Sequence, residues 1–175
     1  YCIDERGNLL EGRNYVATVE GNIYEEVAFF QPVTITLPTV MVRREVIENV
    51  GGFDEAMDRF EDTDLWRRIA KKHRIGIIKE PTCRLRTHTD NTLRSQDPAK
   101  IIAAIEYYVA KIFQEDADMD AAFLGRGASL LYEYYGLAFV SVPAWRHHGF
   151  ALLRKSILSC PPRFAAVAKA GLKVF

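Results

Sequence analysis

The sequence predicts an α/β fold class for the first part of the chain and an all-helical region after it. Short stretches with β-branched residues at alternate positions occur only before residue 97. Beyond that residue the apolar period changes from that of a strand to that of a helix. We therefore predict two domains, 1–97 and 98–175. The expected strands are residues 1–3, 32–42, 75–79 and 83–87.

Two helices are expected within the first domain. Residues 44–49 form a short helical stretch that ends at Gly51-Gly52, where a helix C-terminus favours glycine. Residues 63–73 are the clearest helix, because Leu65, Trp66 and Ile69 make an apolar stripe and a cap is available from Asp62 or Thr63.

The second domain has apolar residues at helical spacing from its first turns, in Ile101, Ile105, Tyr108 and Ile112. Further helices are expected around 130–139, 150–158 and 163–174. Residues 115–120 carry four carboxylates and are predicted to be a solvated loop between helices.

The composition excludes several classes of protein. The 175 residues carry 23 basic and 23 acidic side chains, so no bulk positive charge attracts nucleic acid. Three cysteines without a Cys-x-x-Cys pair argue against disulfides and zinc, and favour a cytoplasmic setting. No uncharged apolar run reaches membrane-spanning length. The chain opens on Tyr1 rather than Met, so we expect its natural start to be absent.

Three ordered motifs carry a resemblance to a known family. They are residues 40–55 (VMVRREVIENVGGFDE), residues 60–70 (FEDTDLWRRIA) and residues 84–88 (RLRTH). Together they resemble the second half of family-two inverting glycosyltransferases with the GT-A fold. The resemblance covers about residues 1 to 95, and it implies the acceptor-side half of a Rossmann-like catalytic domain followed by a helical tail.

Asp62 and Glu61 are the candidate catalytic residues. They lie at the predicted start of a helix, where unpaired N–H groups and the helix dipole favour a carboxylate. A positioned carboxylate can take a proton from a sugar hydroxyl that attacks an anomeric carbon. In the family the aspartate of this acidic pair is the usual base, so Asp62 is the first choice and Glu61 the second. The alternative is that both only cap the helix.

The residues around the acidic pair are the candidate acceptor-binding residues. Two glycines without Cβ would let a sugar approach the backbone, and in the family the loop that follows them lies against the acceptor site. A purely structural loop is the alternative, above all for its aspartate. The set is Gly51, Gly52, Phe53, Asp54 and Trp66, with Arg84 and Arg86 further on.

Alternation along an extended segment would place Arg84, Arg86 and His88 on one face and Cys83, Leu85 and Thr87 toward the core. Cations suit a diphosphate leaving group. In relatives, a histidine at this place helps an Asp-x-Asp motif bind Mn²⁺ or Mg²⁺, so the resemblance implies that His88 is a metal ligand. Asp116-Ala-Asp118 spells that motif but follows the base in chain order, so we reject it. The metal would be held mostly by residues absent from this chain.

The resulting hypothesis is an inverting transfer of a sugar from a nucleotide diphosphate sugar to a glycan or lipid-linked hydroxyl acceptor. A fragment without the donor-binding half is expected to be inactive alone. One alternative is a binding or docking module with a helical membrane- or protein-interaction tail. A hydrolase ranks last, because adjacent carboxylates cannot easily flank one glycosidic bond. Residues 141–175 hold six basic residues and no acidic one, which suits peripheral contact with an anionic membrane.

Overall fold

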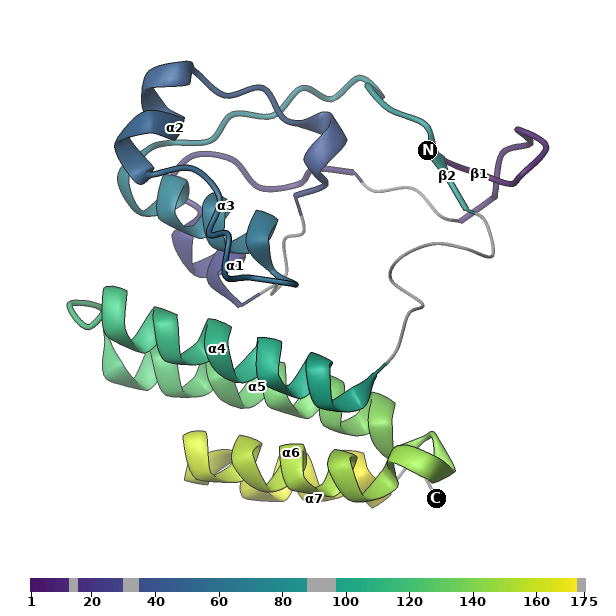
Figure 1. Ribbon diagram of the computed structural model, residues 1–175, viewed down its shortest axis with the longest axis vertical. Helices are drawn as coiled ribbons and strands as arrows, with labels where there is room; N and C mark the ends of the chain where they lie inside the picture. Colours follow the sequence, from purple (N-terminus) through teal and green to yellow (C-terminus); the bar gives the residue numbers. More distant parts are fainter. Residues whose placement is uncertain (13–15, 30–34, 88–96, 173–175) are drawn as a thin grey trace. The chain divides into compact units, whose positions relative to one another are not determined.

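A computed structural model describes residues 1–12, 16–29, 35–87 and 97–172 (Figure 1). The chain divides into two compact units, Tyr1–Asp97 and Pro98–Phe175.

The first unit is built around helix α3 (Glu61–Lys72), which packs against α1 (Tyr24–Ala28) and α2 (Arg44–Val50). Its inward face carries the apolar stripe that the sequence predicts, with Leu65, Trp66 and Ile69 all buried. The remaining elements are β1 (Cys2–Ile3), the 3₁₀ helix η1 (Leu37–Thr39) and β2 (Leu85–Arg86).

The predicted fold class is wrong. Instead of a Rossmann-like α/β domain with several strands, the described residues are mostly helical. Their sheet has two strands, β1 and β2, which pair in parallel with Cys2 opposite Leu85 and Ile3 opposite Arg86. The acceptor-side half of a GT-A domain is therefore not the fold of this unit.

The predicted strand at residues 1–3 is confirmed as β1. The other strand predictions are wrong or too long, because a strand needs a partner for its backbone groups, whatever its own β propensity. Pro38 lies in the 3₁₀ helix η1, so the described part of 32–42 is not extended throughout. In 75–79 only Ile75 forms a bridge, with Gly21. Within 83–87 the strand is two residues long and Leu85 is 41% exposed, so it does not face a core as expected.

The helix predictions for the first unit depend on local signals and fared better. Helix α2 ends at Gly51, which has a left-handed φ of 85°, and this confirms the predicted glycine cap. Helix α3 begins two residues earlier than expected. Its N-cap is Phe60 rather than Asp62 or Thr63, and Phe60 is itself left-handed, with φ 67°.

The second unit consists of α-helices joined by short turns. Its elements are α4 (Pro98–Glu115), α5 (Ala121–Val140), η3 (Pro143–Trp145), α6 (Arg146–Ser159), η4 (Pro161–Arg163) and α7 (Phe164–Leu172). The apolar positions expected at the start of this unit are buried along α4, as their period predicts. No helix in the described part of the chain has both the length and the apolar character needed to cross a membrane.

Helices α5 and α6 pack unusually closely because glycines face each other. A Cβ on Gly149 would lie 2.6 Å from the backbone nitrogen of Val140 and 2.8 Å from the carbonyl oxygen of Gly136. Helix backbones therefore approach where no side chain intervenes. A buried hydrogen bond of 2.9 Å between the hydroxyls of Ser129 and Ser156 also joins the pair.

The acidic turn between α4 and α5 is only partly as predicted. Asp120 caps α5 by accepting a 2.6 Å hydrogen bond from the backbone N–H of Phe123. Asp116, however, is buried rather than solvated.

Candidate functional site

The first turn of α3 holds the acidic pair that the sequence singles out. Glu61 is exposed, whereas Asp62 is partly buried. Phe60, which precedes them, is buried and is the one non-glycine residue with positive φ among residues 1–12, 16–29, 35–87 and 97–172. Such a conformation costs free energy in a residue with a Cβ, and strain of this kind concentrates at functional sites.

The two carboxylate oxygens of Asp62 have different surroundings. Oδ1 accepts hydrogen bonds from the backbone N–H of Thr63 at 2.6 Å and from its hydroxyl at 3.2 Å. Oδ2 has no hydrogen-bond partner among the described residues. One oxygen thus fixes the carboxylate on the helix, and the other can accept a proton from an incoming group.

A cluster of charged residues next to the acidic pair was missed by the sequence reasoning. Asp64 is fully buried and forms ion pairs of 2.8 Å with Arg67 and with Arg68. The guanidinium of Arg68 also donates to the carbonyl of Gly52 at 2.6 Å and to the carbonyl of Val50. The spacing of Asp64, Arg67 and Arg68 at i, i+3 and i+4 on one helix was the available signal.

Arg68 therefore joins two of the three sequence motifs. It fastens the end of α2, with its glycine pair, to the helix that carries Asp62. Gly51 and Gly52 both have positive φ, and a Cβ on either would meet nothing within 4 Å. The space beside these two glycines is therefore not filled by neighbouring atoms, as expected where a ligand is to approach the backbone.

The loop after the glycines contains one exposed and one structural residue. Phe53 is half-exposed. Asp54 accepts a 3.0 Å hydrogen bond at Oδ1 from the backbone N–H of Ala56, and its carbonyl accepts one of 3.1 Å from Met57. This is an Asx-type turn, the structural role that the sequence favoured for Asp54.

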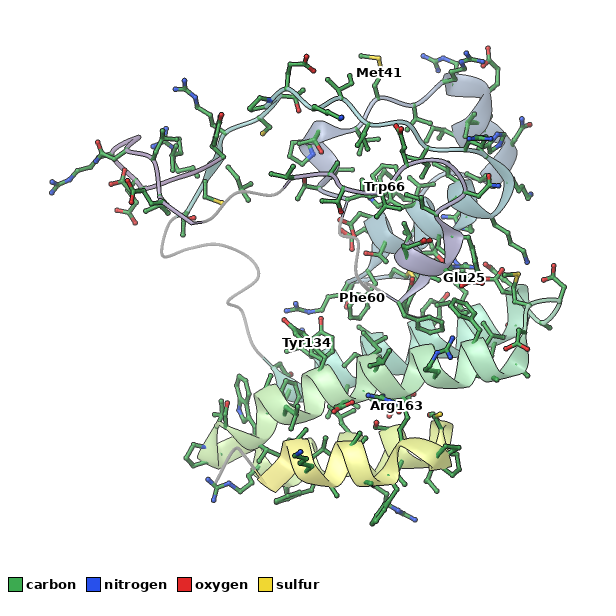
Figure 2. The ribbon with its side chains drawn as sticks, turned by 180° about the vertical axis from the view of Figure 1, so that it is seen from behind. Glu25, Met41, Phe60, Trp66, Tyr134 and Arg163 are labelled. Carbon is green, nitrogen blue, oxygen red and sulfur yellow. The ribbon has the colours of Figure 1, made fainter. Side chains whose placement is uncertain are left out.

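Trp66 lies inside the helical cluster of the first unit (Figure 2). Its indole N–H donates to the carbonyl of Ile35 at 3.2 Å. Its ring is buried, so it supports the site through packing rather than by presenting a surface.

The arginines of β2 take part in different contacts from those around Asp62. Arg86 donates to the carbonyls of Asp4 (3.1 Å) and Glu5 (2.7 Å), which fixes the turn after β1. Hydrogen bonds from Asn8 lower the pKa of the Asp4 carboxyl in the same turn. Arg84 is exposed. The contacts of α3 involve α1 and α2, whereas those of β2 involve β1, so the structure divides the expected site residues into two sets.

The predicted metal ligand, His88, lies outside the described residues. Within the part of the chain that is described, no group of three or more His, Cys, Asp or Glu side chains is arranged to hold a metal ion. The candidate site on α3 offers the carboxylate of Asp62 as a proton acceptor. The loop at Gly51 and Gly52 is joined to the same helix by Arg68.

Comparison with known proteins adds no relative: no protein-family model, no curated protein and no solved structure matches this chain.

Proposed function

We propose that this chain takes part in inverting glycosyl transfer, with Asp62 as the general base. The proposal follows the three motifs in their order along the chain, and it is supported most directly by the half-anchored carboxylate of Asp62. The fold class expected from the resemblance is not part of it. The proposed chemistry depends on the local geometry of α2, α3 and the loop between them.

The reaction needs one proton acceptor beside the attacking hydroxyl. Oδ2 of Asp62 takes the proton of that hydroxyl as its oxygen attacks the anomeric carbon of the donor. A bond forms from the acceptor oxygen to that carbon, and the bond to the nucleotide diphosphate breaks and leaves its electron pair on the phosphate. A single displacement inverts the configuration at the anomeric carbon.

The other residues of the site orient the base and the acceptor. The left-handed Phe60 sets the direction in which the first turn of α3 emerges, and Arg68 holds the open Gly51-Gly52 backbone against the same helix. Elements that are fixed in this way favour reaction through orientation once an acceptor hydroxyl is bound beside Asp62.

A Mn²⁺ or Mg²⁺ ion would supply positive charge for the leaving diphosphate when bound, and the resemblance implies that His88, outside the described residues, would be one ligand. The described residues do not supply a complete set of ligands. The ligands other than His88 therefore have to come from elsewhere, and none of the steps above depends on the ion.

Substitution of Asp62 by Asn tests the assignment in the natural protein. The amide cannot accept the proton, so the transfer rate should fall by about a hundredfold or more while donor binding stays nearly unchanged. Glu61→Gln is the matched control, because it makes the same chemical change at the neighbouring exposed position and should leave the rate near that of the wild type. A normal rate for Asp62→Asn, measured as nucleotide diphosphate release, would remove Asp62 from the mechanism.

A further inference from the structure

The first unit ends in sequence at Asp97 and the second begins at Pro98, so a single Asp–Pro peptide bond joins them. Pro98 is the first residue of α4, a position that favours proline because its missing N–H would have no partner within the helix. Asp97 precedes the helix, belongs to no helix or strand, and is exposed. Water can therefore reach this bond, and breaking it would interrupt no element of either unit.

An aspartate followed by a proline brings a nucleophile and a good leaving group to the same peptide bond. The side-chain carboxylate of an aspartate can reach the main-chain carbonyl carbon of its own residue and close a five-membered ring. Attack within one residue has a large entropic advantage over attack by water. The nitrogen that precedes a proline ring is that of a tertiary amide, so acid protonates it and expels it more readily than an ordinary peptide nitrogen.

We propose that the Asp97–Pro98 bond cleaves itself in acid and divides the chain into residues 1–97 and 98–175. A carboxylate oxygen of Asp97 attacks the main-chain carbonyl carbon of the same residue, and a C–O bond forms. The C–N bond to Pro98 breaks with its electron pair on nitrogen, and that nitrogen takes a proton from the acidic solution.

Water completes the reaction. One water molecule opens the cyclic anhydride left on Asp97, which regains its side-chain carboxyl and becomes a new C-terminus. Pro98 becomes a new N-terminus with a secondary amine. The net change is hydrolysis of one peptide bond, with no oxidant, reductant or metal, and it is independent of the proposed sugar transfer.

The location of the bond decides what the cleavage does. The first product keeps α1, α2 and α3 with the candidate base, and the second product keeps the helices from α4 to α7. Both compact units retain all of their own elements. The chain thus contains a chemical means of losing the covalent link between its units when the solution becomes acidic.

The sequence supplies two internal controls, each with half of the required combination. Asp-Pro occurs once in the 175 residues. The Glu80–Pro81 bond has the proline, but its longer carboxylate would have to close a six-membered ring. The Asp120–Ala121 bond has an aspartate directly before a helix, α5, but no proline. All four of these residues are exposed, as Asp97 is.

Incubation of the full chain in dilute acid, with a parallel sample at neutral pH, tests the proposal. Mass spectrometry should show two fragments, residues 1–97 and 98–175, that accumulate in acid and not at neutral pH. The bonds Glu80–Pro81 and Asp120–Ala121 should stay intact over the same period. An uncleaved chain in acid, or cleavage at either control bond as fast as at Asp97–Pro98, overturns the proposal.

Three variants separate the contributions of the two residues. Asp97→Asn removes the carboxylate nucleophile and Pro98→Ala removes the leaving group, so each should abolish the two fragments. Ala121→Pro should create a second cleavage point after Asp120, because it restores the combination at the start of another helix, where proline is tolerated. Undiminished cleavage of Asp97→Asn, or an intact Asp120 bond in Ala121→Pro, would contradict the mechanism.

Discussion

Arg68 is the residue on which the geometry of the candidate site most depends. Its guanidinium contacts Asp64 on its own helix and the carbonyls of Val50 and Gly52 at the end of the preceding one. A planar fork with several donors can serve all three acceptors, whereas a lysine ammonium on this stem lacks that geometry. Loss of the side chain would leave the buried Asp64 with less compensation for its charge.

Arg68→Met should therefore lower the free energy of unfolding by about 3 kcal/mol, the scale expected when one partner of a largely buried ion pair is removed. Lys72→Met is the control, because Lys72 is exposed on the same helix and should change stability by less than about 0.5 kcal/mol. Urea denaturation of both variants measures the difference. Equal free energies of unfolding for the two variants would show that the contacts of Arg68 contribute little to stability.

The sequence predicted that Asp62 lies at the start of a helix, but it did not predict its place inside the first turn or the roles of its neighbours. Sequence reasoning treated Trp66 and Arg86 as ligand contacts, whereas their polar atoms bind backbone carbonyls of this chain. It also passed over Asp64, although its partners Arg67 and Arg68 follow it on the same helix. Charge spacing alone does not distinguish a solvated pair from a buried one.

At the scale of elements, helices were predicted well and strands poorly, for a physical reason. A helix satisfies its hydrogen bonds within the segment, so its apolar period is visible locally, as along α4. A strand depends on a partner that can lie far along the chain, as β1 and β2 do. The described β-branched residues around Pro38 have strand propensity, but they belong to none of the strands that the structure describes.

The contact between α5 and α6 makes a sharp prediction at this scale. Gly149→Ala should destabilise the second unit by about 1–3 kcal/mol, because the new Cβ would lie 2.6 Å from a backbone atom of Val140 and the helices would have to move apart. Thermal unfolding followed by circular dichroism measures the loss.

Gly171→Ala is the control for that experiment, because it makes the same substitution within α7, where the new Cβ would meet Leu153 at an ordinary 3.7 Å. It should stabilise the helix by up to about 1 kcal/mol. A loss of stability for Gly171→Ala as large as that for Gly149→Ala would contradict the close-packing account.

At the scale of the whole molecule, the chain combines two compact units, of which the first carries the candidate site and the second is helical. The division at Asp97 falls where the apolar period changes in the sequence.

The stereochemistry of sugar transfer is the sharpest test of Asp62 as the base of an inverting reaction. The natural protein is incubated with a panel of nucleotide diphosphate sugars and a hydroxyl acceptor, and proton NMR reports the anomeric configuration of the product as it forms. A base-assisted single displacement predicts a product of inverted configuration, formed by the wild type and by Glu61→Gln and lost in Asp62→Asn. A product of retained configuration, or undiminished transfer by Asp62→Asn, would contradict the account.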